Sequence, residues 1–324
     1  MKAAVYYQNG PPGVFRYEDV PDPKAGRGEI VLRVQAVSIE GGDLLNRAAG
    51  PLKTTPHIVG YQAAGTVMEV GEGASGFKVG QRVVSFMWSG SHASVAAAQA
   101  RHTWAVPEGM DLVAASVVPV AFGTAHDCLF EFGHLKTGET VLVQGAAGGV
   151  GLAAVQIAKR AGATVFGTAS SDDRLERLKA YGLDRGFNYK AGDVTAAIMA
   201  ATGDHGVDLV VDPIAGRVLA QSIACLAHRG RISLVGFAGR DQYTPELFPL
   251  MRKEASITGV FLGAEVDRQP ERTRAVIEQL IADCAAGTLK PVIDRVFPLS
   301  QAAAAHEYIE SRRAFGRVVL VPEV

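Results

Sequence analysis

The chain has 324 residues, of which 48% are hydrophobic, and this length predicts two domains with separate cores. The formal net charge is −1 and no stretch is strongly basic, so we expect no nucleic-acid partner. The apolar runs end before the ~20 residues that a membrane helix needs, so we expect no membrane partner.

Residues 1 to about 120 predict a mainly β domain. Apolar segments such as 3–7 and 29–37 alternate with turn signals such as Asn9-Gly-Pro-Pro-Gly13, and glycines recur from Gly60 to Gly80. Many short strands with Gly and Pro between them are typical of a small β-barrel. The apolar stretch 114–132 is compatible with a helix, which we expect to bridge to the next domain.

From Thr140 the pattern changes to alternating strands and helices, which predicts a parallel sheet covered by helices on both faces. A helix is predicted after the second strand, at 172–181, and a long amphipathic helix at 271–286. Residues 292–321 have strand, helix and strand character, and we expect them to return to the first domain. The predicted strands are 141–144, 164–168, 186–189, 207–212, 231–236 and 256–261.

The first of these strands leads into the turn Gly145-Ala-Ala-Gly-Gly-Val-Gly151 and then into a helix. Strand, glycine turn and helix in this order predict the phosphate-binding start of a dinucleotide fold. Gly148 lets the backbone approach a pyrophosphate, and Gly151 lets the helix pack close to the strand. Ala146 stands where the first glycine of GxGxxG is usual, and the alternative is a glycine-rich turn without a ligand.

The residues after the second strand bear on the choice of dinucleotide. NAD sites commonly place an acid there to bind the ribose 2′-OH, but here no acid comes before Asp172. Ser170, Ser171 and Arg174 favour a 2′-phosphate and hence NADPH. The alternatives are that a serine only caps the next helix and that Arg174 is a solvated surface charge.

The segment 146–159, with shorter pieces at 60–65, 79–83, 187–189 and 306–312, resembles the zinc-free quinone oxidoreductases. These form the zeta-crystallin-like group of the medium-chain dehydrogenase/reductase superfamily, and the resemblance covers essentially the whole chain. It implies an α/β fold with a Rossmann-type doubly wound parallel sheet inserted into a GroES-like β-barrel domain. The GroES-like domain would hold residues 1–121 and 264–324, and the Rossmann NADPH-binding domain residues 122–263.

The resemblance also implies the cofactor contacts. Family members bind the adenosine 2′-phosphate with a basic residue, a tyrosine and a C-terminal arginine, and Arg174, Tyr189 and Arg312 stand at these positions. Thr124 matches a residue beside the nicotinamide, and 235–237 match the loop that supports the nicotinamide ribose. The predicted contacts are Thr124, Ala147, Gly148, Gly149, Val150, Gly151, Ser170, Ser171, Arg174, Tyr189, Val235, Phe237 and Arg312.

Zinc members of the superfamily hold a catalytic ion with a Cys, a Gly-His-Glu motif and a later Cys. This chain has Glu40, Gly60-Tyr61-Gln62 and Val120 at these places, and Glu40 alone cannot form a three-ligand site, so we predict no metal. Closer relatives commonly carry Asn in place of Glu40 and an acid in place of Gln62. The cysteines at 128, 225 and 284 lie far apart without a CxxC pair, which fits a reducing cytoplasm.

Quinones and activated alkenes accept hydride without a Lewis acid, and a hydroxyl can stabilise the developing oxyanion. Tyr61 is the first candidate for this catalytic donor and Glu40 the second. The alternatives are that backbone satisfies the Tyr61 hydroxyl and that Glu40 pairs with Arg47. Met87 and Trp88 are predicted to line the substrate side, unless the same run forms barrel core.

Three functions remain open at this point. The first is an NADPH-dependent quinone reductase, with a small-molecule electron acceptor as substrate. The second is an NADPH-dependent reductase of alkenals, enones or enoyl thioesters. The third is a non-catalytic NADPH-binding protein with a structural or RNA-binding role. The resemblance implies a homodimer through the sheet edge at 257–260, because an apolar edge needs pairing or cover.

Overall fold

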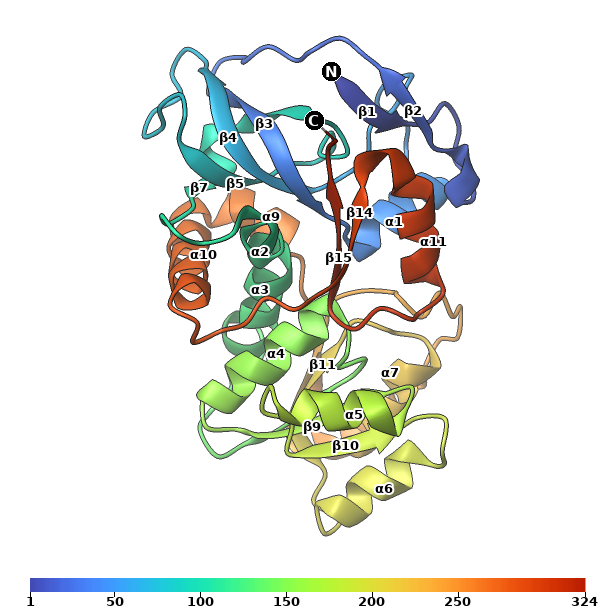
Figure 1. The fold of residues 1–324 in the computed structure, drawn as a ribbon. Helices are drawn as coiled ribbons and strands as arrows, with labels where there is room; N and C mark the ends of the chain where they lie inside the picture. The colour runs from blue at the N-terminus through green and yellow to red at the C-terminus, as the bar shows by residue number, and fades with distance from the viewer. Residues whose placement is uncertain (324) are drawn as a thin grey trace. The chain divides into compact units, whose positions relative to one another are not determined.

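The computed structural model describes residues 1–323, which divide into two units (Figure 1). The first unit holds Met1–Val120 and the C-terminal residues from Glu265 on. The second holds Ala121–Ala264. Both ends of the chain therefore belong to one unit, and the other unit is contiguous in sequence.

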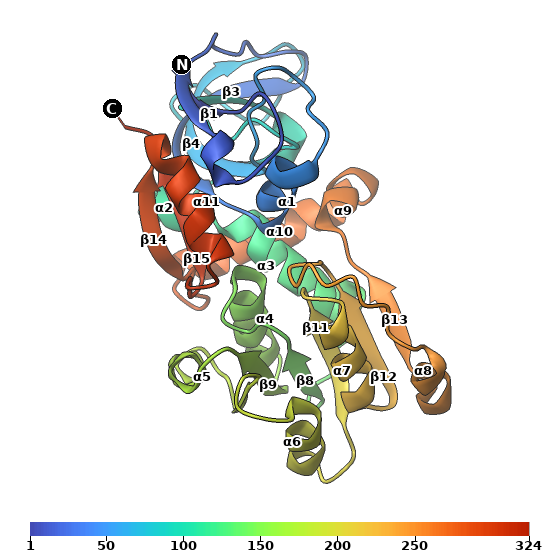
Figure 2. The same cartoon turned by 90° about the vertical axis from the view of Figure 1, so that its right-hand side faces the viewer.

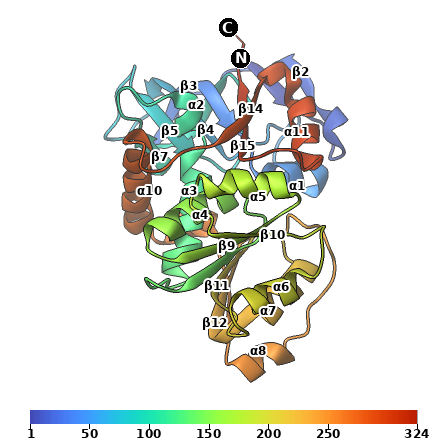
Figure 3. The same cartoon turned by 60° about the horizontal axis from the view of Figure 1, so that its bottom comes forward.

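The second unit is built on a six-stranded parallel sheet with the order β10-β9-β8-β11-β12-β13 (Figures 2 and 3). Counting β8 as the first strand gives 3-2-1-4-5-6, the doubly wound dinucleotide-binding order. The predicted parallel sheet is therefore confirmed. Its strands are β8 (Thr140–Val143), β9 (Thr164–Ala169), β10 (Arg185–Asn188), β11 (Val207–Asp212), β12 (Leu226–Leu234) and β13 (Ser256–Gly259).

Helices follow most of these strands, and Figure 3 shows α5 beside β9 and β10. Apolar residues of the strands and helices, among them Leu142, Phe166, Ile198 and Ile223, form one buried core. The helices are α4 (Gly149–Arg160), α5 (Asp172–Lys179), α6 (Val194–Ala201), α7 (Arg217–Cys225) and α8 (Phe248–Lys253).

Several element boundaries differ from those predicted, most of all the start of β12. β12 begins at Leu226 rather than at 231 because Leu226 pairs with Val207 before a shift in register that places Arg231 opposite Leu209. The shift accommodates Arg229 in the left-handed region, at φ 59°. α5 ends at Lys179 because the chain turns there through Gly182, whose φ is 105°.

The first unit is mainly β, as predicted. Its seven-stranded sheet has the order β14-β15-β3-β4-β5-β7, with β6 paired to β3, and β1 and β2 form a separate pair. β15 runs antiparallel to β3, so the C-terminal segment returns to this unit. The strands are β1 (Lys2–Val5), β2 (Arg16–Asp19), β3 (Glu29–Ser38), β4 (Gln62–Val70), β5 (Arg82–Phe86), β6 (Val95–Gln99), β7 (Thr103–Ala105), β14 (Ile293–Pro298) and β15 (Arg317–Val321).

The apolar stretch predicted as one bridging helix is divided into shorter pieces. The Ser116 hydroxyl donates to the Val113 carbonyl at 2.8 Å, and Pro119 fits only the first turn of the helix that follows. A short π-helical segment continues the last piece at Asp127–Glu131. The remaining helices are α1 (Gly41–Ala49), α2 (Leu112–Ala115), α3 (Val118–His126), α9 (Leu262–Arg268), α10 (Pro270–Ala285) and α11 (Ala302–Glu310).

Arg47 on α1 connects distant parts of the first unit. Its guanidinium lies 2.6 Å from the Glu310 carboxylate and 3.1 Å from Nδ1 of His306. Arginine only donates, so Nδ1 accepts and the proton of His306 sits on Nε2, 3.1 Å from Nε2 of His92. Both rings are buried, and burial lowers the pKa of His92 to about 3 and that of His306 well below its ordinary value. The two histidines therefore form a neutral, buried pair.

None of the helices formed by residues 1–323 combines the length and the apolar character needed to cross a bilayer.

Candidate functional site

The glycine turn between β8 and α4 has the geometry of a phosphate-binding turn. Gly145 adopts a φ of 60°, so it supplies the sharp turn that the sequence pattern alone would assign to position 146. A Cβ at Gly151 would lie 2.5 Å from the carbonyl oxygen of Gly145, so only glycine lets α4 pack here. The first N–H groups of α4 have no acceptor within the helix, which leaves them available to an anion.

The end of β9 carries the residues predicted to select the cofactor. The Ser171 hydroxyl accepts from the backbone N–H of Arg174 at 3.4 Å and caps α5. Asp172 is held by the Asn188 side chain at 3.1 Å, so this carboxylate is tied to the end of β10. Tyr189 follows directly, and its backbone N–H donates to the Ala169 carbonyl. Ser170, Ser171, Arg174 and Tyr189 therefore gather around the ends of β9 and β10.

The other predicted cofactor residues are divided between the units. Thr124 is buried on α3 in the second unit, and Val235 and Phe237 follow β12, with Phe237 61% exposed. Arg312 belongs to the first unit, after α11, and has a φ of 58°, which is uncommon for a residue other than glycine.

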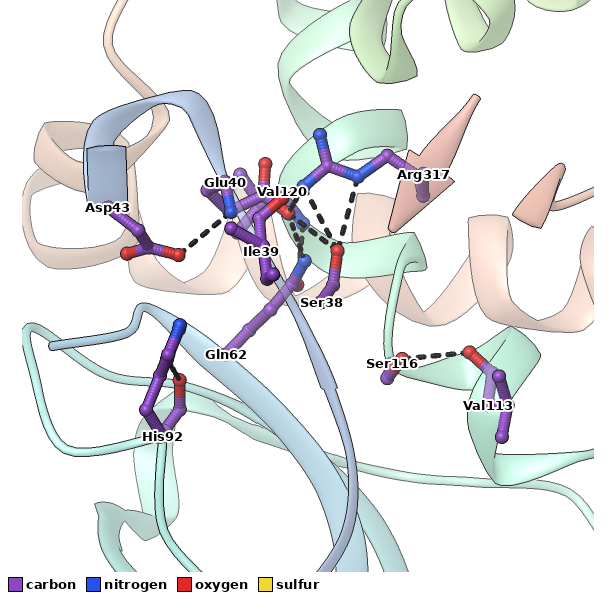
Figure 4. Close-up of polar contacts among 11 residues, drawn as sticks. Ser38, Ile39, Glu40, Asp43, Gln62, His92, Val113, Ser116, Val120 and Arg317 are labelled. Carbon is purple, nitrogen blue, oxygen red and sulfur yellow. Dashed lines mark hydrogen bonds and ion pairs between the residues drawn. The ribbon is translucent and has the colours of Figure 1, made fainter. Parts of the chain in front are cut away.

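Glu40 lies just before α1 and is 4% exposed (Figure 4). Its Oε1 accepts from the Ser38 hydroxyl at 2.9 Å and from the Gln62 amide at 2.7 Å. It also pairs with the guanidinium of Arg317 on β15. The other end of the Gln62 amide accepts from the backbone N–H of Val120 at 3.1 Å. The residues at the three positions that correspond to zinc ligands, Glu40, Gln62 and Val120, therefore lie together. Gln62 bonds to the other two, and Arg317 neutralises the charge of Glu40.

The alternative that Glu40 pairs with Arg47 is wrong, because Arg47 pairs with Glu310. Arg317 is absent from the residues predicted from the sequence. The one available signal is a basic residue at the start of the otherwise apolar final strand, Arg317–Val321. Among residues 1–323 no group of three or more His, Cys, Asp or Glu side chains is placed to hold a metal ion. Metal-independent chemistry stays a prediction.

Tyr61 lies beside the start of α1. A Cβ at Gly42 would be 2.1 Å from the Tyr61 hydroxyl, so the tyrosine occupies space that only glycine leaves open. The hydroxyl accepts from the Asn46 side chain at 3.1 Å, and not from backbone as the alternative had it. Burial, followed by the nearby Asp43 carboxyl, raises the pKa of Tyr61 to about 12. The hydroxyl therefore keeps its proton at neutral pH.

The aromatic run after β5 is divided between core and surface. Met87 is 5% exposed and belongs to the core of the first unit, as the alternative reading expected, so its side chain is not open to a substrate. Trp88 is 42% exposed and packs edge-on against Phe86. Of the two residues predicted to line the substrate side, Trp88 has a side chain that is accessible and Met87 does not.

The comparisons with known proteins bear on this arrangement. A model described as "Alcohol dehydrogenase GroES-like domain" matches residues 26–110, and one described as "Zinc-binding dehydrogenase" matches residues 149–283. The quinone oxidoreductase of Rattus norvegicus is 32% identical over 326 residues, which cover 99% of this chain and 98% of that protein. The chain belongs to the quinone oxidoreductase family of the medium-chain dehydrogenase/reductase superfamily. The resemblance seen in the sequence is thus confirmed.

Solved structures of the same superfamily match the whole chain. The quinone oxidoreductase of Escherichia coli complexed with NADPH aligns with a TM-score of 0.92 at 27% identity, over 99% of this chain and all of that one. A 2-haloacrylate reductase aligns with a TM-score of 0.86 at 31% identity over both full chains. The predicted fold, a Rossmann-type sheet inserted into a GroES-like domain, is therefore confirmed, and the chain is an oxidoreductase of this superfamily.

Proposed function

We propose that this oxidoreductase transfers hydride from NADPH to a quinone without a metal ion. The observation that carries the proposal is the full-length similarity to quinone oxidoreductases, on a chain whose Tyr61 hydroxyl retains a proton to donate. The similarity to a 2-haloacrylate reductase supports a second candidate, reduction of an activated alkene. Both acceptors are electron-poor at carbon and generate an oxyanion that a hydroxyl can stabilise.

In the second unit, a nicotinamide dinucleotide would bind at the residues predicted for it. The turn 145–151 would hold the pyrophosphate on the N-terminus of α4. Ser170, Ser171, Arg174 and Tyr189 would hold the 2′-phosphate, and Val235 and Phe237 the nicotinamide ribose. This assignment is compatible with the capping role of Ser171, because the cap uses the backbone N–H of Arg174 and not its guanidinium. A free 2′-hydroxyl lacks the charge that Arg174 would bind, which favours NADPH over NADH.

In the first unit Tyr61 would act as the proton donor. The bound NADPH supplies the hydride. Asn46 occupies a lone pair of the Tyr61 oxygen, and among residues 1–323 no acceptor takes its proton. The O–H group is therefore left to donate to the substrate oxygen as negative charge develops there. Glu40 is tied to Arg317, Ser38 and Gln62 and would act by holding this region in place, not by donating a proton.

A screen of NADPH oxidation tests the proposed function. Candidate acceptors are 1,2-naphthoquinone, a 2-alkenal and an enoyl thioester, with NADH as the control cofactor. Fastest oxidation with the quinone is the expected result, and turnover of the alkenal or thioester alone would favour the second candidate. NADPH binding without oxidation by any acceptor would point to a non-catalytic protein.

Replacing Tyr61 with phenylalanine is expected to lower kcat about 100-fold, the lower range for loss of a general acid. Tyr6→Phe is the matched control, because it also removes one tyrosine hydroxyl from the first unit, and the Tyr6 hydroxyl is buried without a hydrogen-bond partner. Steady-state kinetics with saturating NADPH measures both variants. Unchanged kcat in Tyr61→Phe would remove Tyr61 from the mechanism.

We also infer a homodimer that forms through β13. This strand is the edge of the six-stranded sheet, and Leu247, Phe248 and Met251 of the neighbouring segment are more than half exposed. Sedimentation is expected to give twice the chain mass of 34.1 kDa. A charge at an exposed edge opposes strand pairing, so Thr258→Lys is expected to shift the mass to that of one chain. A monomeric native protein would contradict the inference.

A further inference from the structure

Four buried polar side chains lie beneath the glycine turn of the second unit. They are Thr168 on β9, Gln144 directly after β8, Asp212 at the end of β11 and Ser222 on α7, and each is at most 3% exposed. Polar groups this deeply buried are costly unless every one is hydrogen-bonded. None of them is among the residues predicted from the sequence to bind the cofactor.

These side chains form one directed chain of hydrogen bonds. The backbone N–H of Gly145 donates to the Thr168 hydroxyl at 3.0 Å, and this hydroxyl donates to the Gln144 carbonyl oxygen at 2.8 Å. The Gln144 amide donates to the Ser222 hydroxyl at 3.1 Å, which donates to the Asp212 carboxylate at 2.9 Å. Every donor points toward the single negative charge at the end, so each bond polarises the next in the same sense.

The other oxygen of Asp212 holds the loop that follows β11. It accepts from the backbone N–H groups of Ile214 and Ala215, each at 2.9 Å. Ala215 has a φ of 62°, a conformation that an alanine adopts only when its surroundings impose it. The carboxylate therefore stabilises a strained loop at the carboxyl edge of the sheet.

This loop in turn carries the segment after β12. Pro213 accepts from the backbone N–H of Ala238 and Ile214 from that of Gly239, both at 3.0 Å, and the Asp212 carbonyl accepts from Val235 at 2.9 Å. A continuous hydrogen-bonded path thus leads from Gly145 to the segment 235–239. All of it lies within the second unit.

We propose that Thr168, Gln144, Ser222 and Asp212 are positioning residues that couple the glycine turn to the segment 235–239. The inference rests on the proposed function, in which the turn binds the pyrophosphate and Val235 and Phe237 support the nicotinamide ribose. The two loops that would contact the cofactor are then held in a fixed relative position. The distance between the binding sites for the two halves of the dinucleotide is therefore fixed before the cofactor binds. Removing a hydrogen bond in the middle of this series is expected to loosen both loops, although the substituted residue lies in neither of them.

Ser222→Ala interrupts the series of hydrogen bonds, because it removes the acceptor of the Gln144 amide and one donor to the Asp212 carboxylate. Ser233→Ala is the matched control: Ser233 is equally buried on β12, and its hydroxyl donates at 2.7 Å to the Cys128 carbonyl, outside the chain. Ser222→Thr keeps the hydroxyl and is the conservative rescue. The first measurement is amide hydrogen exchange of the protein without cofactor.

In Ser222→Ala, exchange is expected to rise about tenfold at Gly145 and, through Ile214 and Ala215, at Ala238 and Gly239 of the segment 235–239, since loss of one buried hydrogen bond is worth about a factor of ten. Ser233→Ala is expected to leave these amides unchanged. A rise at only one of the two loops, or an equal rise in both variants, would overturn the coupling.

The second measurement is the Kd for NADPH and for its adenosine half, 2′,5′-ADP. Ser222→Ala is expected to weaken NADPH binding about tenfold while 2′,5′-ADP changes less, because the half molecule does not span both loops. Ser222→Thr restores NADPH binding. Equal weakening in Ser222→Ala and Ser233→Ala would overturn the positioning role. A native protein that binds no NADPH would contradict the proposed function, and the exchange measurement would still decide the coupling.

Discussion

Replacing Arg317 with methionine is expected to lower the free energy of unfolding by about 3–5 kcal/mol, the range for breaking a buried ion pair at one partner. Glu40 is 4% exposed, and its Oε1 accepts from Ser38 and Gln62 in addition to Arg317. Without the guanidinium, these neutral donors leave a buried carboxylate with no compensating charge. Arg317 also donates to the Ser38 hydroxyl and to the Ile39 carbonyl, so these acceptors lose a partner as well.

Urea unfolding of three variants separates the charge from the loss of packing. Arg317→Met combined with Glu40→Gln removes both charges and is expected to recover most of the lost stability, because the pair is then replaced by neutral groups. Lys2→Met breaks an ion pair whose side chains are 49% and 76% exposed, and is expected to cost no more than about 1 kcal/mol. If Arg317→Met lowers the free energy of unfolding as little as Lys2→Met does, the buried carboxylate of Glu40 does not need Arg317 for its stabilisation.

The second large effect is a loss of stability in acid that depends on the His92–His306 pair. Both histidines have a pKa below that of the unfolded chain, about 6.5, because burial disfavours their charged forms. Below pH 6.5 the unfolded state therefore binds more protons than the folded state, and stability falls with pH. Each histidine contributes up to about 1.4 kcal/mol per pH unit, and the loss continues toward the folded pKa, which is about 3 for His92.

Between pH 8 and pH 5 the pair is expected to remove about 4 kcal/mol of stability. Asp43 acts in the opposite sense, since burial raises its pKa well above the ordinary value and its folded form then binds the extra proton. The contribution of the histidine pair is therefore obtained by comparing the native protein with a variant of His306. His306→Gln keeps an acceptor for Arg47 but cannot titrate, and its unfolding free energy is expected to depend less steeply on pH than that of the native chain. Parallel pH profiles for the two proteins would contradict the assignment.

The sequence predicted local features well and long-range pairings poorly. The strand–turn–helix at 140–160 is a contiguous pattern whose glycines have local steric reasons, and a parallel sheet follows from the alternation of strands and helices. The network around Glu40 could not be predicted in the same way, because Ser38 and Arg317 are 279 positions apart. Charge alone suggested Arg47, a basic residue that follows Glu40 in the sequence, as the partner of Glu40. The start of β12 was likewise missed, because its register shift leaves no mark in the hydrophobic pattern.

The division of the first unit between the two ends of the chain has a consequence for biosynthesis. While the chain is being made, the second unit is complete once residue 264 has left the ribosome, and it can fold as a contiguous piece. The first unit must wait, because Glu310 and His306, the partners of Arg47, and Arg317, the partner of Glu40, are translated only after the second unit. Until then Glu40 has no counter-ion from Arg317, and β3 lacks its neighbour β15. Residues 1–120 of the first unit therefore emerge before the second unit but complete their fold after it.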